Sequence, residues 1–303
     1  GSGNFHGPMV ADLARRSPAQ AGAGAVSRMN PVLKQRLLSV ALVLPVFLTC
    51  LLWLPNPAWA AISGIPLGLA AMEWAKLGGY RHSETLFPAL VLASCAILYA
   101  CMGLQVYVTG QIVFFCLLLS LLFWTTVAPL WLRYGWSCPH RSLHGAVGWI
   151  LLVPTWVAFV ELQTTPRILL MVLLVVWIAD TAAYFAGKRF GRHKMAPRIS
   201  PGKTWEGAGG AFLAVALYAG LLGFMPQTNP KIFGPPGLLL WFFVLTGFSI
   251  IGDLFESWIK RLAAVKDSGN LLPGHGGILD RIDGLTSTLP FAAVCLGSRM
   301  FQS

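Results

Sequence analysis

The chain has 303 residues, of which 56% are hydrophobic and 11% charged, and its formal net charge is +11. Soluble domains average about 25% charged residues, so this composition excludes a water-soluble globular protein and indicates an integral membrane protein with several spans. No basic segment interleaved with aromatic residues is present, so nucleic acid is not an expected partner. The positive charge is expected to face the anionic headgroups of membrane lipids.

Residues 1–30 differ from the rest of the chain. They begin with GSGNFHGPMV, which resembles a tag remnant, and continue as a small, polar, weakly basic stretch without an apolar run. We expect disorder in this segment and exclude it from the fold. Basic residues then lead directly into a full-length apolar segment, so a cleaved signal peptide is not expected.

Nine apolar segments approach the length of about 20 residues that a helix needs to cross the hydrocarbon core. We predict an all-α polytopic membrane protein with about nine transmembrane helices. The predicted segments are 37–55, 58–75, 86–104, 111–132, 145–161, 167–187, 206–225, 237–258 and 284–299. The first five form an N-terminal group over residues 31–165, and the last four form a C-terminal catalytic region with cytoplasmic loops over residues 166–303.

Lysine and arginine residues predict the orientation, because they accumulate on the cytoplasmic side of a membrane. With nine spans and a cytoplasmic N-terminus, all but three of the 22 basic residues fall on that side. The exceptions are Arg167, Lys231 and Arg299. Inverting the chain or removing one helix would spoil this distribution, so we expect the C-terminus outside.

Acidic residues are concentrated late in the chain. A carboxylate at the end of an apolar helix is costly unless it has a partner or a function. If the eighth segment stays helical, Asp253 and Lys260 lie on one of its faces. Seven of the eleven acids occur from position 180 onward: Asp180, Glu206, Asp253, Glu256, Asp267, Asp280 and Asp283. This distribution predicts a site at the cytoplasmic ends of the later helices.

A glycine-rich loop separates Asp253 from Asp280. Its stretch SGNLLPGHGG cannot form a regular helix, because it contains a proline and closely spaced glycines. Backbone N–H groups in such a loop, including those of Gly276 and Gly277, can approach an anion. The nearby cationic donors are Lys260, Arg261, Lys266 and His275. Carboxylates for a hard cation beside donors for phosphate predict a Mg²⁺–phosphate site.

A second polar block joins the sixth and seventh segments and contains SPGKTWEG. If the next helix begins near Lys203, Ser200 lies close to its N-terminus, where free N–H groups favour anions. The likeness of this block to a P-loop is superficial. Pro197 stands where the motif has its upstream glycine, and no strand is expected before it.

These residues together resemble a known family. The run SWIKR, then KD, then PGHGGILDRID, from Ser257 to Asp283, is similar to the signature of phosphatidate cytidylyltransferases, also called CDP-diacylglycerol synthases. The block SPGKTWEG resembles a second motif of that family, although Gly202 stands where the usual form has lysine, and Asp180 stands at the position of an upstream acid. The resemblance at the level of motifs covers about residues 175–290, and the earlier helices are similar only in hydropathy.

The resemblance implies a reaction in which CTP and phosphatidic acid give CDP-diacylglycerol and pyrophosphate. It implies the cofactor Mg²⁺, alone or with a second cation, and a site at the cytoplasmic face of a membrane, for which we expect the bacterial inner membrane. Asp253 and Asp280 carry over as metal ligands. Asp283 either joins them as a ligand or orients Arg281.

The lipid phosphate that attacks CTP is already an anion, so positioning and charge stabilisation are expected to do most of the catalytic work. We assign Lys260, Lys266 and Arg281 to this phosphate chemistry beside Asp253 and Asp280. The residues expected on the nucleotide side are Asp180, Ser200, Lys203, Thr204, Glu206, Arg261, His275, Gly276 and Gly277. Of these, His275 is expected to order the loop.

Plainer interpretations exist for several residues. Asp253 could be a structural acid paired with Lys260, and Asp180 a simple helix-end acid. Glu73, at the end of the second segment, is expected to serve as an interfacial anchor.

Two competing functions remain. One is a CTP-dependent membrane enzyme that acts on another lipid, such as an isoprenoid alcohol kinase or an archaeal-lipid cytidylyltransferase. The other is a cation-coupled transporter, although no internal repeat supports it. An apolar helix face left over from the bundle would make a homodimer reasonable.

Overall fold

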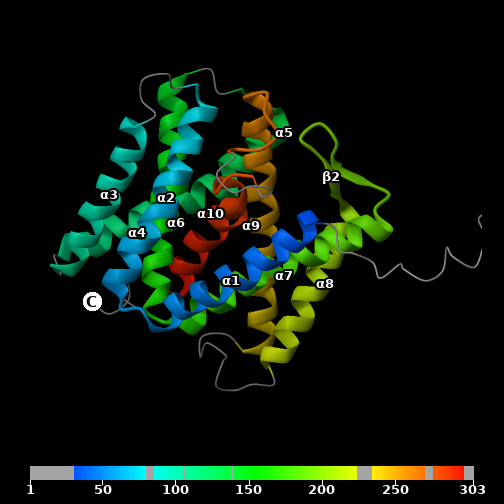
Figure 1. Ribbon diagram of the computed structural model, residues 1–303, viewed down its shortest axis with the longest axis horizontal. Coiled ribbons are helices and arrows are strands. Elements are labelled where there is room, and N and C mark those ends of the chain that lie inside the picture. Colours follow the sequence, from blue (N-terminus) through cyan, green and yellow to red (C-terminus); the bar gives the residue numbers. More distant parts are fainter. Residues whose placement is uncertain are drawn as a thin grey trace, which may run out of the picture. The chain divides into compact units, whose positions relative to one another are not determined.

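The computed structural model is almost entirely helical, with one small hairpin (Figure 1). It describes residues 31–79, 85–104, 107–137, 140–223, 234–269 and 276–296. The first elements are α1 (Pro31–Trp53), α2 (Asn56–Leu77), α3 (Leu86–Gly103), α4 (Tyr107–Leu122), the π-helical turn η2 (Phe123–Val127), α5 (Ala128–Tyr134) and α6 (Arg141–Gln163). The remaining elements are α7 (Pro166–Phe190), β1 (Lys194–Ala196), β2 (Ser200–Thr204), α8 (Trp205–Gly223), α9 (Pro235–Leu262) and α10 (Leu279–Leu296).

The chain divides into two compact units, residues 1–46 and residues 47–303. The helix α1 contributes residues to both units, and all other described elements belong to the second one. The site and its supports therefore lie entirely within residues 47–303.

Each predicted apolar segment overlaps a helix of the structure. Among the described residues, six helical stretches are long and apolar enough to cross a bilayer: Leu86–Gly103, Thr109–Tyr134, Arg141–Gln163, Pro166–Phe190, Trp205–Gly223 and Pro236–Leu262. The chain is thus a helical integral membrane protein. The count of nine spans and the sides on which the two ends lie stay predictions.

The hairpin shows that the expectation of no strand before the GKT block is wrong. Its strands β1 and β2 pair antiparallel, with Lys194 opposite Thr204 and Ala196 opposite Ser200. The next helix begins at Trp205, close to Lys203 as expected. Thr204 ends the strand and caps that helix, because its Oγ1 accepts a hydrogen bond from the backbone N–H of Gly207 at 3.1 Å. Ser200 and Lys203 therefore lie on a strand that leads into α8.

Glycines allow the helices around the hairpin to cross with their backbones in contact. A Cβ atom on Gly207 of α8 would lie 2.9 Å from the carbonyl oxygen of Ala183 on α7. The pair α9 and α10 crosses in the same way, since a Cβ on Gly252 would lie 2.6 Å from the carbonyl oxygen of Asp283, and one on Gly284 would lie 2.7 Å from Ser249 Oγ. The second crossing brings the neighbours of Gly252 and Gly284 together.

The helix α10 connects the two halves of the sequence. It packs against α9 and α7 from the later part of the chain, and against α2, α4 and α6 from the earlier part. The hydroxyl of Thr155 on α6 donates to the carbonyl oxygen of Thr286 on α10 at 3.2 Å. The earlier helices thus form part of the support for the residues that α10 carries.

The close crossing at Gly252 predicts that a single added methyl group lowers the stability of the protein. In Gly252→Ala the added Cβ overlaps α10, and overpacking of this kind costs about 1–3 kcal/mol, more than the roughly 1 kcal/mol that alanine gains in helix propensity. We expect a lower apparent melting temperature in detergent. Gly247→Ala on the same helix is the matched control, because nothing lies within 4 Å of its added Cβ. Equal melting temperatures for the two variants would contradict the crossing.

Candidate functional site

A cavity of about 360 Å³ lies between α7, the hairpin, α8, α9 and α10. Its apolar lining comes from small residues of α7 and α8 and from Ile250 of α9. Its polar lining comes from Asp180, Ser200, Lys203, Thr204, Asp253, Asp280 and Asp283. The cavity is therefore amphipathic, and it gathers most of the acids that the sequence analysis singled out.

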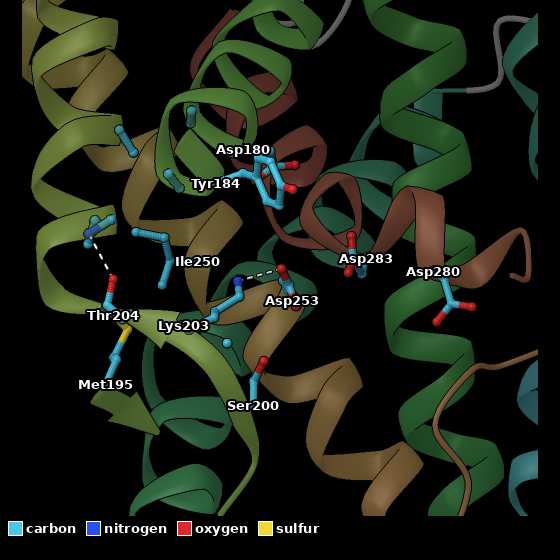
Figure 2. A pocket seen from close by; sticks show the side chains of 16 residues that line it. Asp180, Tyr184, Met195, Ser200, Lys203, Thr204, Ile250, Asp253, Asp280 and Asp283 are labelled. Atoms are coloured by element: carbon cyan, nitrogen blue, oxygen red, sulfur yellow. Dashed lines mark hydrogen bonds and ion pairs between the residues drawn. The ribbon is translucent and has the colours of Figure 1, made fainter. Parts of the chain in front are cut away.

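Lys203 and Asp253 form an ion pair across this cavity, from β2 to α9 (Figure 2). Their side chains are 24% and 30% exposed, so both remain accessible from the cavity. Ser257, one turn after Asp253 on α9, donates its hydroxyl to Asp253 Oδ1 at 3.4 Å. The plainer interpretation paired Asp253 with Lys260 instead, and the structure does not show that pair.

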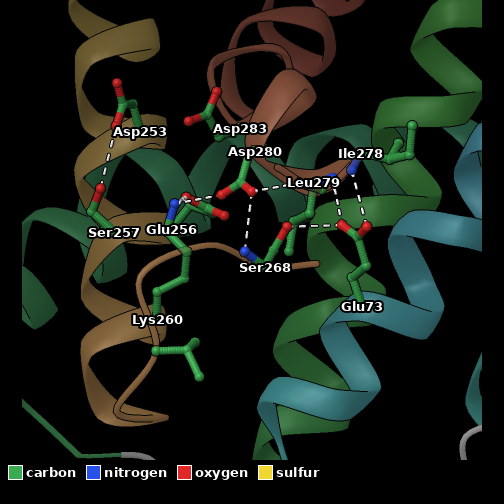
Figure 3. Close-up of polar contacts among 12 residues, drawn as sticks. Glu73, Asp253, Glu256, Ser257, Lys260, Ser268, Ile278, Leu279, Asp280 and Asp283 are labelled. Carbon is green, nitrogen blue, oxygen red and sulfur yellow. Dashed lines mark hydrogen bonds and ion pairs between the residues drawn. The ribbon is translucent and has the colours of Figure 1, made fainter. Parts of the chain in front are cut away.

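Lys260 instead joins two other carboxylates. Its Nζ lies 2.5 Å from Glu256 Oε2 on the preceding turn of α9 and 2.6 Å from Asp280 Oδ1 on α10. Glu256 is 3% exposed and Lys260 is 8% exposed. A buried ion pair needs such close geometry to offset the loss of hydration. This contact fixes the end of α9 against the start of α10 (Figure 3).

Asp280 is also held by backbone groups of the loop that precedes α10. Its Oδ2 accepts hydrogen bonds from Ser268 N at 3.0 Å and from Gly277 N at 2.8 Å. Gly276 has a φ of +77°, a conformation that favours glycine, and a Cβ there would lie 2.8 Å from Asp280 Oδ2. The predicted glycines thus wrap around a carboxylate of the protein itself.

Asp180, Asp253 and Asp283 reach the cavity from α7, α9 and α10 respectively (Figure 2). Asp283 also accepts a hydrogen bond from Gly284 N at 2.7 Å. Hard divalent cations take oxygen ligands of this kind. Within the described part of the chain, no three acidic, histidine or cysteine side chains lie close enough to surround a metal ion by themselves. Ligands from water or from a bound phosphate would have to complete such a site.

Glu73 on α2 meets the same region from the earlier half of the chain (Figure 3). Its carboxylate accepts hydrogen bonds from Ser268 Oγ, Ile278 N and Leu279 N at 2.8, 3.0 and 2.8 Å. The side chain is only 2% exposed, so the expectation of an interfacial anchor is wrong. The rule that drew attention to Asp180, an acid at the end of an apolar helix, applies equally to Glu73 and could have identified it.

The other predicted residues lie outside the cavity lining. Glu206 accepts hydrogen bonds from the backbone N–H of His193 at 3.2 Å and is 2.6 Å from its Nδ1. Arg261 Nε donates to the carbonyl oxygen of Ile199 at 3.2 Å, which ties α9 to the turn of the hairpin. Lys266 and Arg281 are exposed. His275 falls outside the described residues, so its role stays a prediction.

Comparison with known proteins extends the resemblance to nearly the whole chain. The model of the Cytidylyltransferase family matches residues 34–298. A Pseudomonas aeruginosa protein named phosphatidate cytidylyltransferase is 39% identical over 275 residues, covering 88% of this chain and 97% of the relative. A Haemophilus influenzae protein of the same name is 32% identical over 282 residues, covering 86% and 97%. A third, from Brucella suis, is 55% identical over 114 residues, covering 37% and 40%.

The family match includes the early helices, for which the sequence motifs alone gave no more than similar hydropathy. It also includes α2 with Glu73, α9 with Asp253 and α10 with Asp280. A cavity lined by lysine and carboxylates at the ends of membrane helices is compatible with an enzyme that transfers a nucleotide to a lipid. The chain belongs to the Cytidylyltransferase family.

Proposed function

We propose that the protein is a phosphatidate cytidylyltransferase, which converts CTP and phosphatidic acid to CDP-diacylglycerol and pyrophosphate in phospholipid biosynthesis. The names of its relatives support this activity. The observation that carries it in the structure is the amphipathic cavity, which is lined by Lys203, four carboxylates and apolar residues of α7 and α8. A phosphate on a lipid needs both environments at once.

The reaction is a substitution at the α-phosphorus of CTP. An oxygen of the phosphatidate phosphate forms the new P–O bond, and the bond to pyrophosphate breaks. The attacking oxygen is already negatively charged, so the site needs no strong base. Catalysis then depends on positioning and on positive charge near the phosphate oxygens. This fits a cavity whose described lining offers a lysine and carboxylates but no activated nucleophile.

A magnesium ion is the cofactor that the donor set fits best. Asp253, Asp280 and Asp283 are the carboxylates that would hold it, and Asp280 stands one turn before Asp283 on α10. When bound, the metal would supply positive charge to the phosphate oxygens. Magnesium usually retains several waters and takes only one or two carboxylates, so the spacing of these acids does not argue against it. A second cation is part of the same proposal.

Lys203 and Ser200 are the side chains that act on the substrates directly. Lys203 lies in the cavity beside Asp253 and can turn its charge to a phosphate. Ser200 on the same strand offers a hydroxyl, and Thr204 fixes the strand to α8. Lys260 does not reach outward in this way, because it is held between Glu256 and Asp280. We infer that it keeps Asp280 in place and balances the buried negative charge.

The location of the site follows from the charge distribution. We propose that the cavity opens to the cytoplasmic side of the bacterial inner membrane, with the N-terminus in the cytoplasm and the C-terminus outside. The basic residues around the hairpin and at the end of α9 support this orientation.

An assay with several acceptors tests the function. Purified protein with labelled CTP and Mg²⁺ is expected to form a labelled lipid from phosphatidic acid. It is expected to form none from isoprenoid alcohols or archaeal-type lipids, the substrates of the alternative enzymes. If only one of those lipids gives a labelled product, that lipid is the substrate in place of phosphatidic acid. Cation transport into liposomes without any turnover of CTP would overturn the proposal as a whole.

Replacing the acidic residues tests the metal assignment. We expect Asp253→Asn and Asp280→Asn each to lower kcat at least about 100-fold, because the charge that offsets the phosphates is no longer positioned. Initial rates at saturating CTP, measured over a range of Mg²⁺ concentrations, give the comparison. If both variants keep most of the wild-type rate, these residues are not the metal ligands.

Two lysines of the hairpin provide a matched pair of variants that tests phosphate binding. Lys203→Met removes the charge in the cavity, and a charged hydrogen bond contributes about 1.5–3 kcal/mol, so kcat/KM for CTP should fall at least about tenfold. Lys194→Met alters the exposed lysine on the neighbouring strand, which does not line the cavity. That variant should stay close to wild type. Equal losses in both would assign the effect to the overall charge of the hairpin.

A further inference from the structure

Glu73 is a buried carboxylate that the proposed reaction does not use. It belongs to α2, yet its strongest contacts are with Ser268, which is 195 residues away in the chain, and with the first turn of α10. Three groups donate hydrogen bonds to it, namely one hydroxyl and two backbone N–H groups. An ionised carboxylate accepts all three at once, and its charge is favourable at a helix N-terminus.

The segments that Glu73 holds are also the segments that hold Asp280. Ser268 donates its hydroxyl to Glu73 and its backbone N–H to Asp280. Gly277 donates its N–H to Asp280, while the next two residues donate to Glu73. The carboxylates of Asp280 and Glu73 therefore bind the same backbone segments from opposite sides, as Figure 3 shows.

The backbone of the loop packs closely against the Glu73 carboxylate. A Cβ atom on Gly277 would collide with Ser268 Oγ and with the Glu73 carboxylate, and a Cβ on Gly269 would collide with Glu73 as well. Both glycines thus allow the backbone to approach the carboxylate directly. If the carboxylate were absent, Ile278 N and Leu279 N would lose their acceptor at the start of a packed helix.

We propose that Glu73 is a positioning residue for this reaction: it fixes Ser268 and the first turn of α10, and through them sets the Asp280 carboxylate at the cavity. The proposal rests on the proposed function, because the consequence of a misplaced Asp280 appears in the metal dependence of catalysis. Glu73 itself does not line the cavity.

The first test is Glu73→Gln in the full-length protein in nanodiscs. Glutamine keeps the size of the side chain, but it has one acceptor oxygen and turns an N–H₂ group toward donors. Loss of a supporting group around a metal site typically costs 10–100-fold in affinity or activity. We expect the Mg²⁺ concentration for half-maximal activity to rise at least about tenfold. Hydrogen exchange at Ile278 and Leu279, measured without CTP, should become faster.

Two further variants separate positioning from folding. Glu161→Gln alters a buried glutamate on α6, near the end of α2 opposite to Glu73, where Asn56 bonds the carbonyl oxygen of Val160. It should leave both the Mg²⁺ dependence and the exchange unchanged. Ser268→Ala removes only the hydroxyl that bonds Glu73 and keeps the N–H that bonds Asp280. It should raise the Mg²⁺ requirement in the same direction as Glu73→Gln, by a smaller factor.

The outcomes are distinct. Wild-type Mg²⁺ dependence and wild-type exchange in Glu73→Gln overturn the proposal, and so does a lower melting temperature with unchanged turnover per folded molecule. If Glu73→Gln does not fold, the Mg²⁺ requirement of Ser268→Ala decides, because an unchanged value overturns the proposal and a raised one supports it. If wild type and Glu161→Gln make no CDP-lipid, the proposed function fails, and hydrogen exchange alone decides whether Glu73 fixes the start of α10.

Discussion

A carboxylate inside an apolar helical protein must have a counter-charge or hydrogen-bond donors within reach, and the arrangement around the cavity follows from this requirement. Asp253 meets it with Lys203, Asp280 meets it with Lys260 and two backbone N–H groups, and Glu73 meets it with three donors of the loop and α10. Each solution joins two different elements. The polar contacts therefore connect different elements of the fold at this end of the helices.

Close helix crossings make these contacts geometrically available. Gly252 and Gly284 let α9 and α10 touch through their backbones, so the following residue on α9, Asp253, and the preceding residue on α10, Asp283, face one cavity. The crossing at Gly207 has the same effect for α7 and α8 and sets the hairpin beside Asp180. These carboxylates belong to different helices. Small residues at the crossings let the helices approach closely, so the carboxylates line one cavity.

Hydropathy and acid placement predicted the helical segments and the C-terminal position of the site, because both depend on composition along the chain. They could not predict which lysine meets which acid. Lys260 shares a helix face with Asp253, but the structure pairs it with Glu256 and Asp280, a choice decided by the crossing of α9 and α10. The hairpin was missed because its strands are short and carry no alternating pattern. Glu73 was misinterpreted because its partners lie in a distant part of the sequence.

The contact between Glu73 and the loop after α9 also limits how this chain can be recombined with a relative. A chimera joined between α2 and α9 would combine a carboxylate from one parent with amides and a hydroxyl from the other, and a small offset would leave buried groups unpaired. The early helices are thus matched to the later ones through specific buried polar contacts, of which this is one. A chimera should therefore take α2, residues 266–269 and the first turn of α10 from the same parent.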